Sequence, residues 1–277
     1  MTIFEKLGYT KIQSRMIHEI IKNENEKYKN NQKINKNNLI GGGSYEIFKF
    51  MGHKIKFEKI KDDDQVHYSL NTLDKNYECL VIIISKNEAN KVCADIHQIS
   101  INKTCPIVGK MKSGGGSLLL KIGIEFIKSI KKEHKIKIIQ IKDNSEKFCK
   151  KNKIKLWLLN TLTNGVPWHI KYDFEPYDIE KMELHETNKI KIIANLRILK
   201  RTKTSIIKEE NLLDIDENIE KIYKKYKNNT ILDFFSELMQ NKNNYSYIED
   251  KQETIIEKLL LFDMTGISYY INLEKYS

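Results

Sequence analysis

Three consecutive glycines directly before a helix-like apolar pattern are the feature that most constrains this 277-residue chain. Gly114, Gly115 and Gly116 precede apolar residues that recur at helical spacing: Leu118, Leu119, Ile122, Phe126, Ile127 and Ile130. A glycine turn that opens a helix brings backbone N–H groups without intrahelical partners close to a ligand, and the helix dipole favours an anion there. The sequence therefore predicts an anion site at this turn, with a flexible linker or a plain tight turn as the alternative interpretation.

Strand-like segments lie on both sides of the glycine turn. Residues 53–60, 65–73, 77–85 and 91–101 are rich in β-branched or aromatic residues, and short polar turns between them predict antiparallel neighbours. After the helix, residues 136–141 alternate like a strand, which should run parallel to residues 91–101 because a helix between two strands usually forms a crossover. The turn is then expected at the carboxyl end of the preceding strand, where open α/β sheets bind ligands.

The chain carries a formal net charge of +11, but the distribution of its charges does not favour a nucleic-acid partner. Lysines are spread along the sequence, and arginine, which forms bidentate contacts to bases and phosphates, occurs only at Arg15, Arg197 and Arg201. We therefore expect a diffuse lysine surface and no specific nucleic-acid binding. The opposing hypothesis, binding through the lysine surface, predicts a steep salt dependence.

The N-terminal residues and the hydropathy of the chain predict the cellular compartment of the protein. The first residues lack an apolar signal region, and no stretch reaches the length of about 18 apolar residues that a membrane span needs. We expect a soluble, cytoplasmic protein with no membrane partner.

The cysteines and histidines do not predict a metal site. Cys79, Cys93, Cys105 and Cys149 have no Cys-x-x-Cys spacing, and the seven histidines form no i, i+4 pair. Because the cysteines lie mostly inside apolar runs, we expect buried, reduced thiols rather than disulfides or zinc ligands.

A run of aspartates raises a different hypothesis, a nucleotidyltransferase. Asp62, Asp63 and Asp64 follow a glycine–serine turn at residues 41–44, as paired metal-binding aspartates would. Such aspartates normally alternate with apolar residues on a strand, so that both face one way. Here they lie together between two strand-like segments, so we favour a hairpin turn.

The order of these segments resembles the GNAT family of N-acetyltransferases, over residues 53–178 and the final strand. In that family a glycine turn opens the central helix and binds the pyrophosphate of coenzyme A. Residues 114–117, Gly-Gly-Gly-Ser, are similar to this motif, with Met111 at the position of the usual Arg or Gln. Asn144 resembles the asparagine that ends the next strand of the family and contacts the coenzyme A arm.

A second stretch carries the resemblance further. Residues 168–177, Trp-His-Ile-Lys-Tyr-Asp-Phe-Glu-Pro-Tyr, look like the family's Tyr-x-Lys-x-Gly-Phe-x-Pro signature. His169 stands at the position of the general-acid tyrosine and Asp173 at that of the glycine. Both strings look closest to a GNAT-like group encoded by large DNA viruses.

The resemblance implies an acyl-coenzyme A-dependent N-acyltransferase that moves an acetyl group from acetyl-coenzyme A to an unknown amine acceptor by direct attack. His169 would be the acid that protonates the departing thiolate, with Tyr172 as the second candidate; a half-buried loop histidine beside Trp168 is the alternative for His169. The residues implied in coenzyme binding are Lys112, Ser113, Gly114, Gly115, Gly116, Ser117 and Asn144.

The departures at Met111, His169 and Asp173 support a second hypothesis. A GNAT-like chain that kept its scaffold but lost turnover would serve as a scaffold or interaction protein, for example one associated with a virion, since a fold does not fix a function.

We expect an α+β fold with a GNAT-like mixed, largely antiparallel sheet flanked by helices. The expected organisation is an N-terminal helix and connector (residues 1–52), the GNAT-like core (53–185), a helical insertion (186–262) and a final strand that returns to the core sheet (263–277).

Overall fold

The computed structural model describes residues 44–87, 90–108, 111, 114–149, 152–178, 183–259 and 261–276. The chain forms two compact units. Unit 1 contains the residues up to Ile141 and those from Asn272 onward, and unit 2 contains Lys142–Ile271. The N-terminal helix expected before the connector falls within residues 1–43, which lie outside the described residues.

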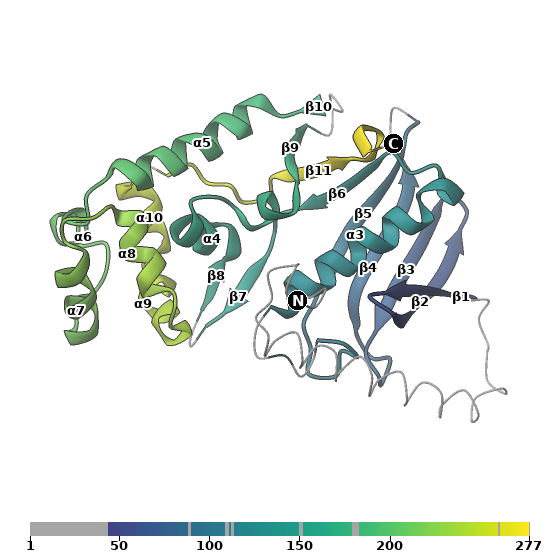
Figure 1. The fold of residues 1–277 in the computed structure, drawn as a ribbon, viewed down its shortest axis with the longest axis horizontal. Helices are drawn as coiled ribbons and strands as arrows, with labels where there is room; N and C mark the ends of the chain where they lie inside the picture. The colour runs from purple at the N-terminus through teal and green to yellow at the C-terminus, as the bar shows by residue number, and fades with distance from the viewer. Residues whose placement is uncertain are drawn as a thin grey trace. The chain divides into compact units, whose positions relative to one another are not determined.

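Unit 1 is built on a mixed, mostly antiparallel sheet, as the sequence predicts (Figure 1). Strands β1 to β5 form an antiparallel meander, and β6 pairs with β5 in parallel through a crossover. The strands are β1 (Ser44–Phe50), β2 (His53–Asp62), β3 (Gln65–Asn71), β4 (Glu78–Lys86), β5 (Val92–Ile99) and β6 (Ile138–Lys142).

Two details of the sheet bear on the expectations from sequence. Residues 44–50, which we expected in the connector, form β1 and pair along their whole length with β2. Asp63 and Asp64 form the turn of the β2–β3 hairpin, and the N–H of Asp63 bonds to the Asp62 carboxylate (3.0 Å). The hairpin interpretation of these aspartates is therefore confirmed.

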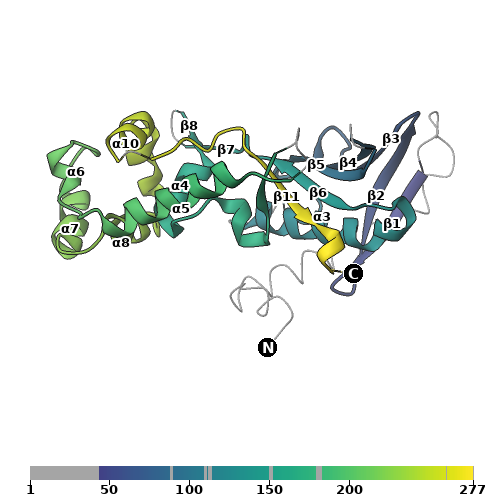
Figure 2. The same ribbon diagram turned by 90° about the horizontal axis from the view of Figure 1, so that it is seen from above.

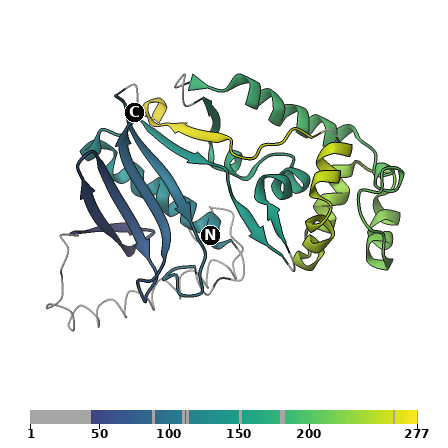
Figure 3. The ribbon, with the colours of Figure 1, turned by 180° about the vertical axis from the view of Figure 1, so that it is seen from behind.

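Helix α3 (Gly115–His134) packs across one face of the unit 1 sheet, as Figures 1 and 3 show from opposite sides. Its apolar residues form the predicted stripe and are buried. Among them, the ring of Phe126 stacks on the ring of Phe57 with a centroid separation of 4.0 Å. The rings of Tyr68 and Phe48 contact Phe126 edge-on, at 5.0 and 5.6 Å. This aromatic cluster is the centre of the unit 1 core.

Lys135 ends α3 in the left-handed conformation (φ +56°), and its N–H bonds to the carbonyl of Lys131. Basic residues in the last turn complement the negative end of the helix dipole.

Unit 2 contains short strands and, beyond residue 185, mostly helices (Figure 2). Strands β7 and β8 form a separate hairpin, whereas β9 pairs with both β10 and β11 in antiparallel fashion. The elements are β7 (Glu146–Phe148), β8 (Lys153–Lys155), α4 (Leu156–Asn164), η1 (Trp168–Tyr172), β9 (Glu175–Asp178), β10 (Glu183–Leu184), α5 (Glu186–Arg201), α6 (Ile206–Glu209), α7 (Glu217–Tyr226), α8 (Ile231–Leu238), η2 (Lys242–Tyr245), α9 (Ser246–Glu249), α10 (Gln252–Lys258) and β11 (Ser268–Asn272).

Side-chain caps fix where the unit 2 helices begin. Asp216 caps α7 by accepting a hydrogen bond from the N–H of Ile219 (2.9 Å). Thr230 and Asp233 form a reciprocal capping box at the start of α8. Such caps satisfy N–H groups that a helix leaves without partners, which explains why polar residues precede these helices.

The chain re-enters unit 1 after β11. The N–H of Leu273, the first residue of η3 (Leu273–Tyr276), donates to the carbonyl of Lys137 (2.9 Å), and the ammonium of Lys131 donates to the carbonyl of Leu273 (2.7 Å). These bonds attach the last described residues to α3 and to the segment that leads into β6.

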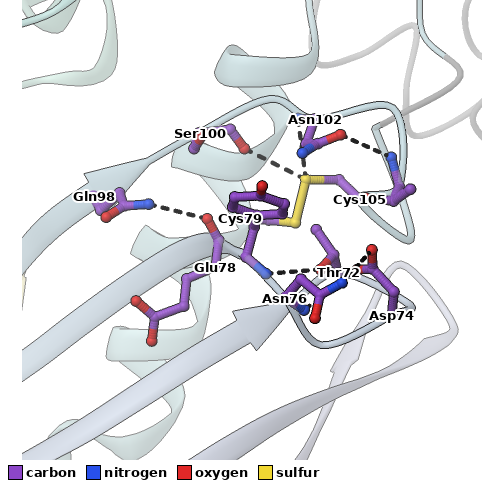
Figure 4. Close-up of a disulfide and its surroundings, with 11 residues drawn as sticks. Thr72, Asp74, Asn76, Glu78, Cys79, Gln98, Ser100, Asn102 and Cys105 are labelled. Atoms are coloured by element: carbon purple, nitrogen blue, oxygen red, sulfur yellow. Dashed lines mark hydrogen bonds between the residues drawn. A yellow bond between two sulfur atoms is a disulfide. The ribbon is translucent and has the colours of Figure 1, made fainter.

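The expectation that the cysteines are all reduced is wrong. Cys79 at the start of β4 and Cys105 in the loop after β5 form a disulfide, while Cys93 and Cys149 are free (Figure 4). The loop after β5 turns back toward β4: the N–H of Ser100 bonds to the carbonyl of Cys79 (2.9 Å). This return brings the two thiols together although 26 residues separate them, so their spacing gave no signal.

Removing this disulfide should destabilise unit 1. Cross-linking residues 26 apart restricts the unfolded chain, so the double substitution Cys79→Ser with Cys105→Ser is expected to cost about 2–4 kcal/mol of unfolding free energy. The loss of unfolding free energy is measured by urea denaturation, monitored through hydrogen exchange of the β4 and β5 amides. Cys149→Ser is the control. Alkylation of the unreduced, denatured chain should modify only Cys93 and Cys149; modification of all four cysteines would contradict the bond.

Candidate functional site

The glycine turn begins α3, as predicted. Gly114 is the N-cap, is exposed and adopts the left-handed conformation (φ +81°), which a residue with a side chain rarely adopts. The first intrahelical bond joins the N–H of Leu118 to the carbonyl of Gly114 (3.0 Å). The N–H groups of Gly115 and Gly116 therefore belong to the first turn, whose donors have no acceptor within the helix. Lys112 and Ser113 lie outside the described residues.

Apolar side chains pack against one side of this first turn. A Cβ atom placed on Gly115 would lie 3.1 Å from the Cβ of Val108 and 3.3 Å from the Cδ1 of Ile101. A Cβ on Gly116 would lie 3.6 Å from the Cδ1 of Ile101, an ordinary contact. Gly115 is accordingly buried, whereas Gly114 is exposed and Gly116 is half-buried. Close packing explains the need for glycine at 115, and the turn keeps an open side at 114 and 116.

The same contacts place the start of α3 at the carboxyl end of β5. Ile101 follows β5 by two residues and touches the first turn of the helix, while Ile96 within β5 lies beneath Gly123 of α3. Ligands of open α/β sheets bind outside the carboxyl ends of strands. The predicted position of the turn is therefore confirmed.

Strands β5 and β6 separate before β5 ends. Their parallel pairing joins Cys93, Ala94 and Asp95 to Ile138, Ile139 and Gln140. The rest of β5, residues 96–99, extends past this pairing toward the start of α3. Among the described residues, the β5–β6 pairing therefore does not include this half of β5.

A β-bulge marks the same half of β5. Opposite β4, Ile82 pairs with Ile96 and Val81 pairs with Gln98, so His97 is the additional residue. Its imidazole Nδ1 lies 3.5 Å from the carboxylate Oδ2 of Asp95. The side chain of His97 is 61% exposed and that of Asp95 is 28% exposed. Burial raises the pKa of Asp95 above its ordinary value, although the nearby His97 opposes this shift.

His97 is not among the site residues predicted from the sequence. A signal was present, because an aspartate and a histidine two positions apart on a strand point to the same face of the sheet. The bulge and the separation of the strands, which give the pair its setting, have no sequence signature.

His169, the predicted acid, lies in unit 2 and is only 1% exposed. Its Nδ1 is 3.2 Å from the Oδ2 of Asp143, which is equally buried. The rings of Trp168, Phe174 and Tyr269 lie around the imidazole, with centroid separations of 5.0, 6.1 and 5.2 Å. A ligand has almost no accessible imidazole surface to contact.

Asp143 is fixed by its backbone and its carboxylate. Its N–H bonds to the carbonyl of Ile267 (2.9 Å), and its own carbonyl accepts from the N–H of Gly266 (2.8 Å). The hydroxyl of Ser145 donates to its Oδ1 (2.6 Å). Burial opposes ionisation of this carboxyl, but the proximity of His169 and the hydrogen bonds from Ser145 outweigh it and hold the pKa below its ordinary value.

The other predicted residues lie in unit 2 as well. Asn144 is exposed, and Tyr172 is half-buried with its ring 5.6 Å from that of Trp168. Asp173, at the position of the family's glycine, adopts the left-handed conformation (φ +65°) as the cap of η1. Aspartate is among the few residues that tolerate this conformation. The predicted site residues are thus divided between the glycine turn of unit 1 and the segments 143–145 and 168–173 of unit 2.

Searches for other kinds of site and for relatives gave negative findings. Within the described ranges, no group of three or more His, Cys, Asp or Glu side chains could hold a metal ion. None of the helices that the structure describes has the length and apolar character that crossing a bilayer requires. A scan against models of known protein families finds no match, and a search of curated proteins finds no significant similarity.

Proposed function

We propose that this protein is an acyl-coenzyme A-dependent N-acyltransferase that transfers an acetyl group from acetyl-coenzyme A to an amine. One observation carries the proposal: the parallel strands β5 and β6 separate past Asp95 and Gln140, and β5 continues to the glycine start of α3. A thioester with a diphosphate and a long amide-containing arm needs both an anion site and unpaired strand backbone.

The residues at the start of α3 are suited to a diphosphate. The first turn supplies N–H donors at the positive end of a helix of 20 residues and contains no acidic side chain. Gly114 is exposed, so a phosphate oxygen can approach the backbone. Backbone groups of residues 96–99 would bond the amides of the arm and polarise the acyl carbonyl.

A catalytically silent scaffold is the second candidate function, and the burial of His169 favours it. If His169 were the essential acid, its 1% exposure would prevent it from meeting a substrate. The two candidates differ in one measurable property, the release of free thiol from acetyl-coenzyme A in the presence of an amine.

Gly116→Asp should abolish coenzyme binding without unfolding the chain. A carboxylate at the second helical position repels a diphosphate but interacts favourably with the helix dipole, and a Cβ there meets only an ordinary contact. Acetyl-coenzyme A at about 100 times its Kd should stabilise the wild type by about 2.7 kcal/mol in thermal unfolding. We expect this stabilisation to be lost in Gly116→Asp.

Gly116→Ala is the matched control, because it adds the same Cβ without the charge. It should keep most of the stabilisation by acetyl-coenzyme A. The proposal is refuted if millimolar acetyl-coenzyme A does not stabilise the wild type, or stabilises Gly116→Asp equally. Binding without thiol release across an amine panel would favour the silent scaffold.

A further inference from the structure

Asp95 and His97 form an acid–base pair on the half of β5 where the strands separate. Asp95 is the last β5 residue paired with β6, opposite Gln140, and His97, two residues further along, is the bulged residue. A bulge redirects a side chain and increases the local twist, which is why bulges occur often beside active sites. The pair therefore lies beside the backbone that the proposed function assigns to the acyl group.

Both side chains point away from α3. Ile96, between them in sequence, faces α3, because its Cδ1 would lie 3.7 Å from a Cβ on Gly123. Alternation along a strand then directs Asp95 to the other face, whereas His97 is the bulged residue, at which strict alternation does not hold. The 3.5 Å separation of their Oδ2 and Nδ1 atoms shows that they share that face, and the imidazole remains 61% exposed.

The residues directly opposite Asp95 on the two neighbouring strands, which form one row across the sheet, are uncharged. Directly opposite Asp95 are Ile83 on β4 and Gln140 on β6, and the next titratable group in the row is His67 on β3, beyond Ile83. The Nε2 of His67 contacts its own neighbour Gln65 (3.2 Å). Asp95 and His97 thus form a local pair, separate from His67.

We propose that His97 is the proton acceptor for the amine and that Asp95 positions its imidazole. This inference rests on the proposed acyltransferase function. In the transfer, the amine nitrogen forms a bond to the acyl carbon, the carbon–sulfur bond breaks, and the nitrogen loses a proton. His97 accepts that proton and passes it to solvent, from which the departing thiolate is protonated, so no other reactant is needed.

Exposure and chemistry distinguish His97 from His169. An imidazole can accept a proton, and the exposed ring of His97 can meet both the amine and water. Asp95 accepts at Nδ1 and leaves Nε2 for the amine, an arrangement in which the carboxylate fixes the orientation of the ring. His169 has a comparable carboxylate partner but no exposed surface.

The test compares His97→Asn and Asp95→Asn with His67→Asn, a control that removes a strand histidine from the same row. Thiol release from acetyl-coenzyme A is measured from pH 5 to 9 with benzylamine, spermidine and a lysine-containing peptide. We expect His97→Asn to lower kcat by about 100-fold or more, as loss of a general base does, with acetyl-coenzyme A binding unchanged. In His97→Asn, the fall of kcat at acidic pH should also disappear. His67→Asn should keep the kcat and the pH profile of the wild type.

Asp95→Asn should lower kcat less than His97→Asn does, because it changes the partner of the imidazole and not the base itself. It should also shift the pH at which kcat falls on the acid side. A second readout needs no turnover: the titration of the Asp95 carboxyl, followed by NMR of its side-chain carbon. Loss of a neighbouring cation should raise the pKa of Asp95 further in His97→Asn.

Equal kcat and pH profiles in the wild type and His97→Asn would overturn the proposal, as would an Asp95 titration that His97→Asn leaves unchanged. A wild type that binds no acetyl-coenzyme A and releases no thiol refutes the acyltransferase function, and the proton-acceptor role falls with it. In that case the carboxyl titration still reports whether the pair exists, so the two failures are distinguishable.

Discussion

Asp143→Ala is expected to destabilise unit 2 by about 3 kcal/mol, because it leaves the buried imidazole of His169 without its carboxylate neighbour. Asp143 and His169 are each 1% exposed, so neither water nor ions can replace the lost carboxylate. The substitution also removes the acceptor of the Ser145 hydroxyl. The imidazole would be left buried beside the ring of Tyr269, without a polar neighbour in place of the carboxylate.

Tryptophan fluorescence reports this loss, because both tryptophans of the chain, Trp157 and Trp168, lie in unit 2. The urea midpoint should fall sharply for Asp143→Ala. Asp214→Ala, which removes an exposed carboxylate (86% exposed) paired with Lys251, should cost at most about 1 kcal/mol. A midpoint for Asp143→Ala within error of that control would contradict the structural role of the buried pair.

The same carboxyl predicts an acid limit for unit 2. The pKa of Asp143 is lower in the folded chain than its ordinary value of 3.8, so the unfolded chain binds more protons as the pH falls. Its contribution to stability is therefore complete above the unfolded pKa and is lost as the pH falls through the folded pKa. Asp143→Asn should flatten the dependence of unit 2 stability on pH below about 4.

Phe126→Ala should have a similarly large effect on unit 1, about 3–5 kcal/mol. Phe126 is fully buried on the sheet-facing side of α3 and contacts the rings of Phe57, Tyr68 and Phe48. Truncation removes these contacts and leaves a cavity that the rigid sheet cannot close.

Hydrogen exchange of the β2, β3 and β4 amides measures the effect on unit 1. Phe262→Ala is the matched control, since it removes the same side chain from a position that is 45% exposed. Phe126→Leu should cost less than Phe126→Ala because it fills part of the cavity. Equal protection of the β3 amides in the wild type and Phe126→Ala would show that the aromatic cluster does not stabilise unit 1.

Much of unit 1 could be predicted because local patterns report burial. Alternation and polar turns located β2 to β5, and the apolar stripe of α3 located the helix and its crossover to β6. Strand β1 was missed because residues 44–50 adjoin a glycine-rich and Asn/Lys-rich stretch, and pairing with β2 decides their conformation. Edge strands depend on such pairing more than on their own composition.

The candidate site was less predictable because tertiary contacts, not local sequence patterns, bring its residues together. The glycine turn was found from sequence, but the Cys79–Cys105 bond depends on a loop that folds back on β4. The burial of His169 depends on Asp143 and Tyr269, which are distant from it in sequence. Neither the bulge at His97 nor the end of the β5–β6 pairing has a residue pattern, since backbone register determines both.

The return of the chain to unit 1 after β11 affects how the protein can be synthesised. Leu273 supplies partners to Lys137 and Lys131, and every residue of unit 2 lies between those lysines and Leu273 in sequence. A ribosome therefore releases the last part of unit 1 only after all of unit 2 has been translated. Domains usually fold as units in N-to-C order during synthesis. In this protein, the first unit to begin folding is the last to be completed.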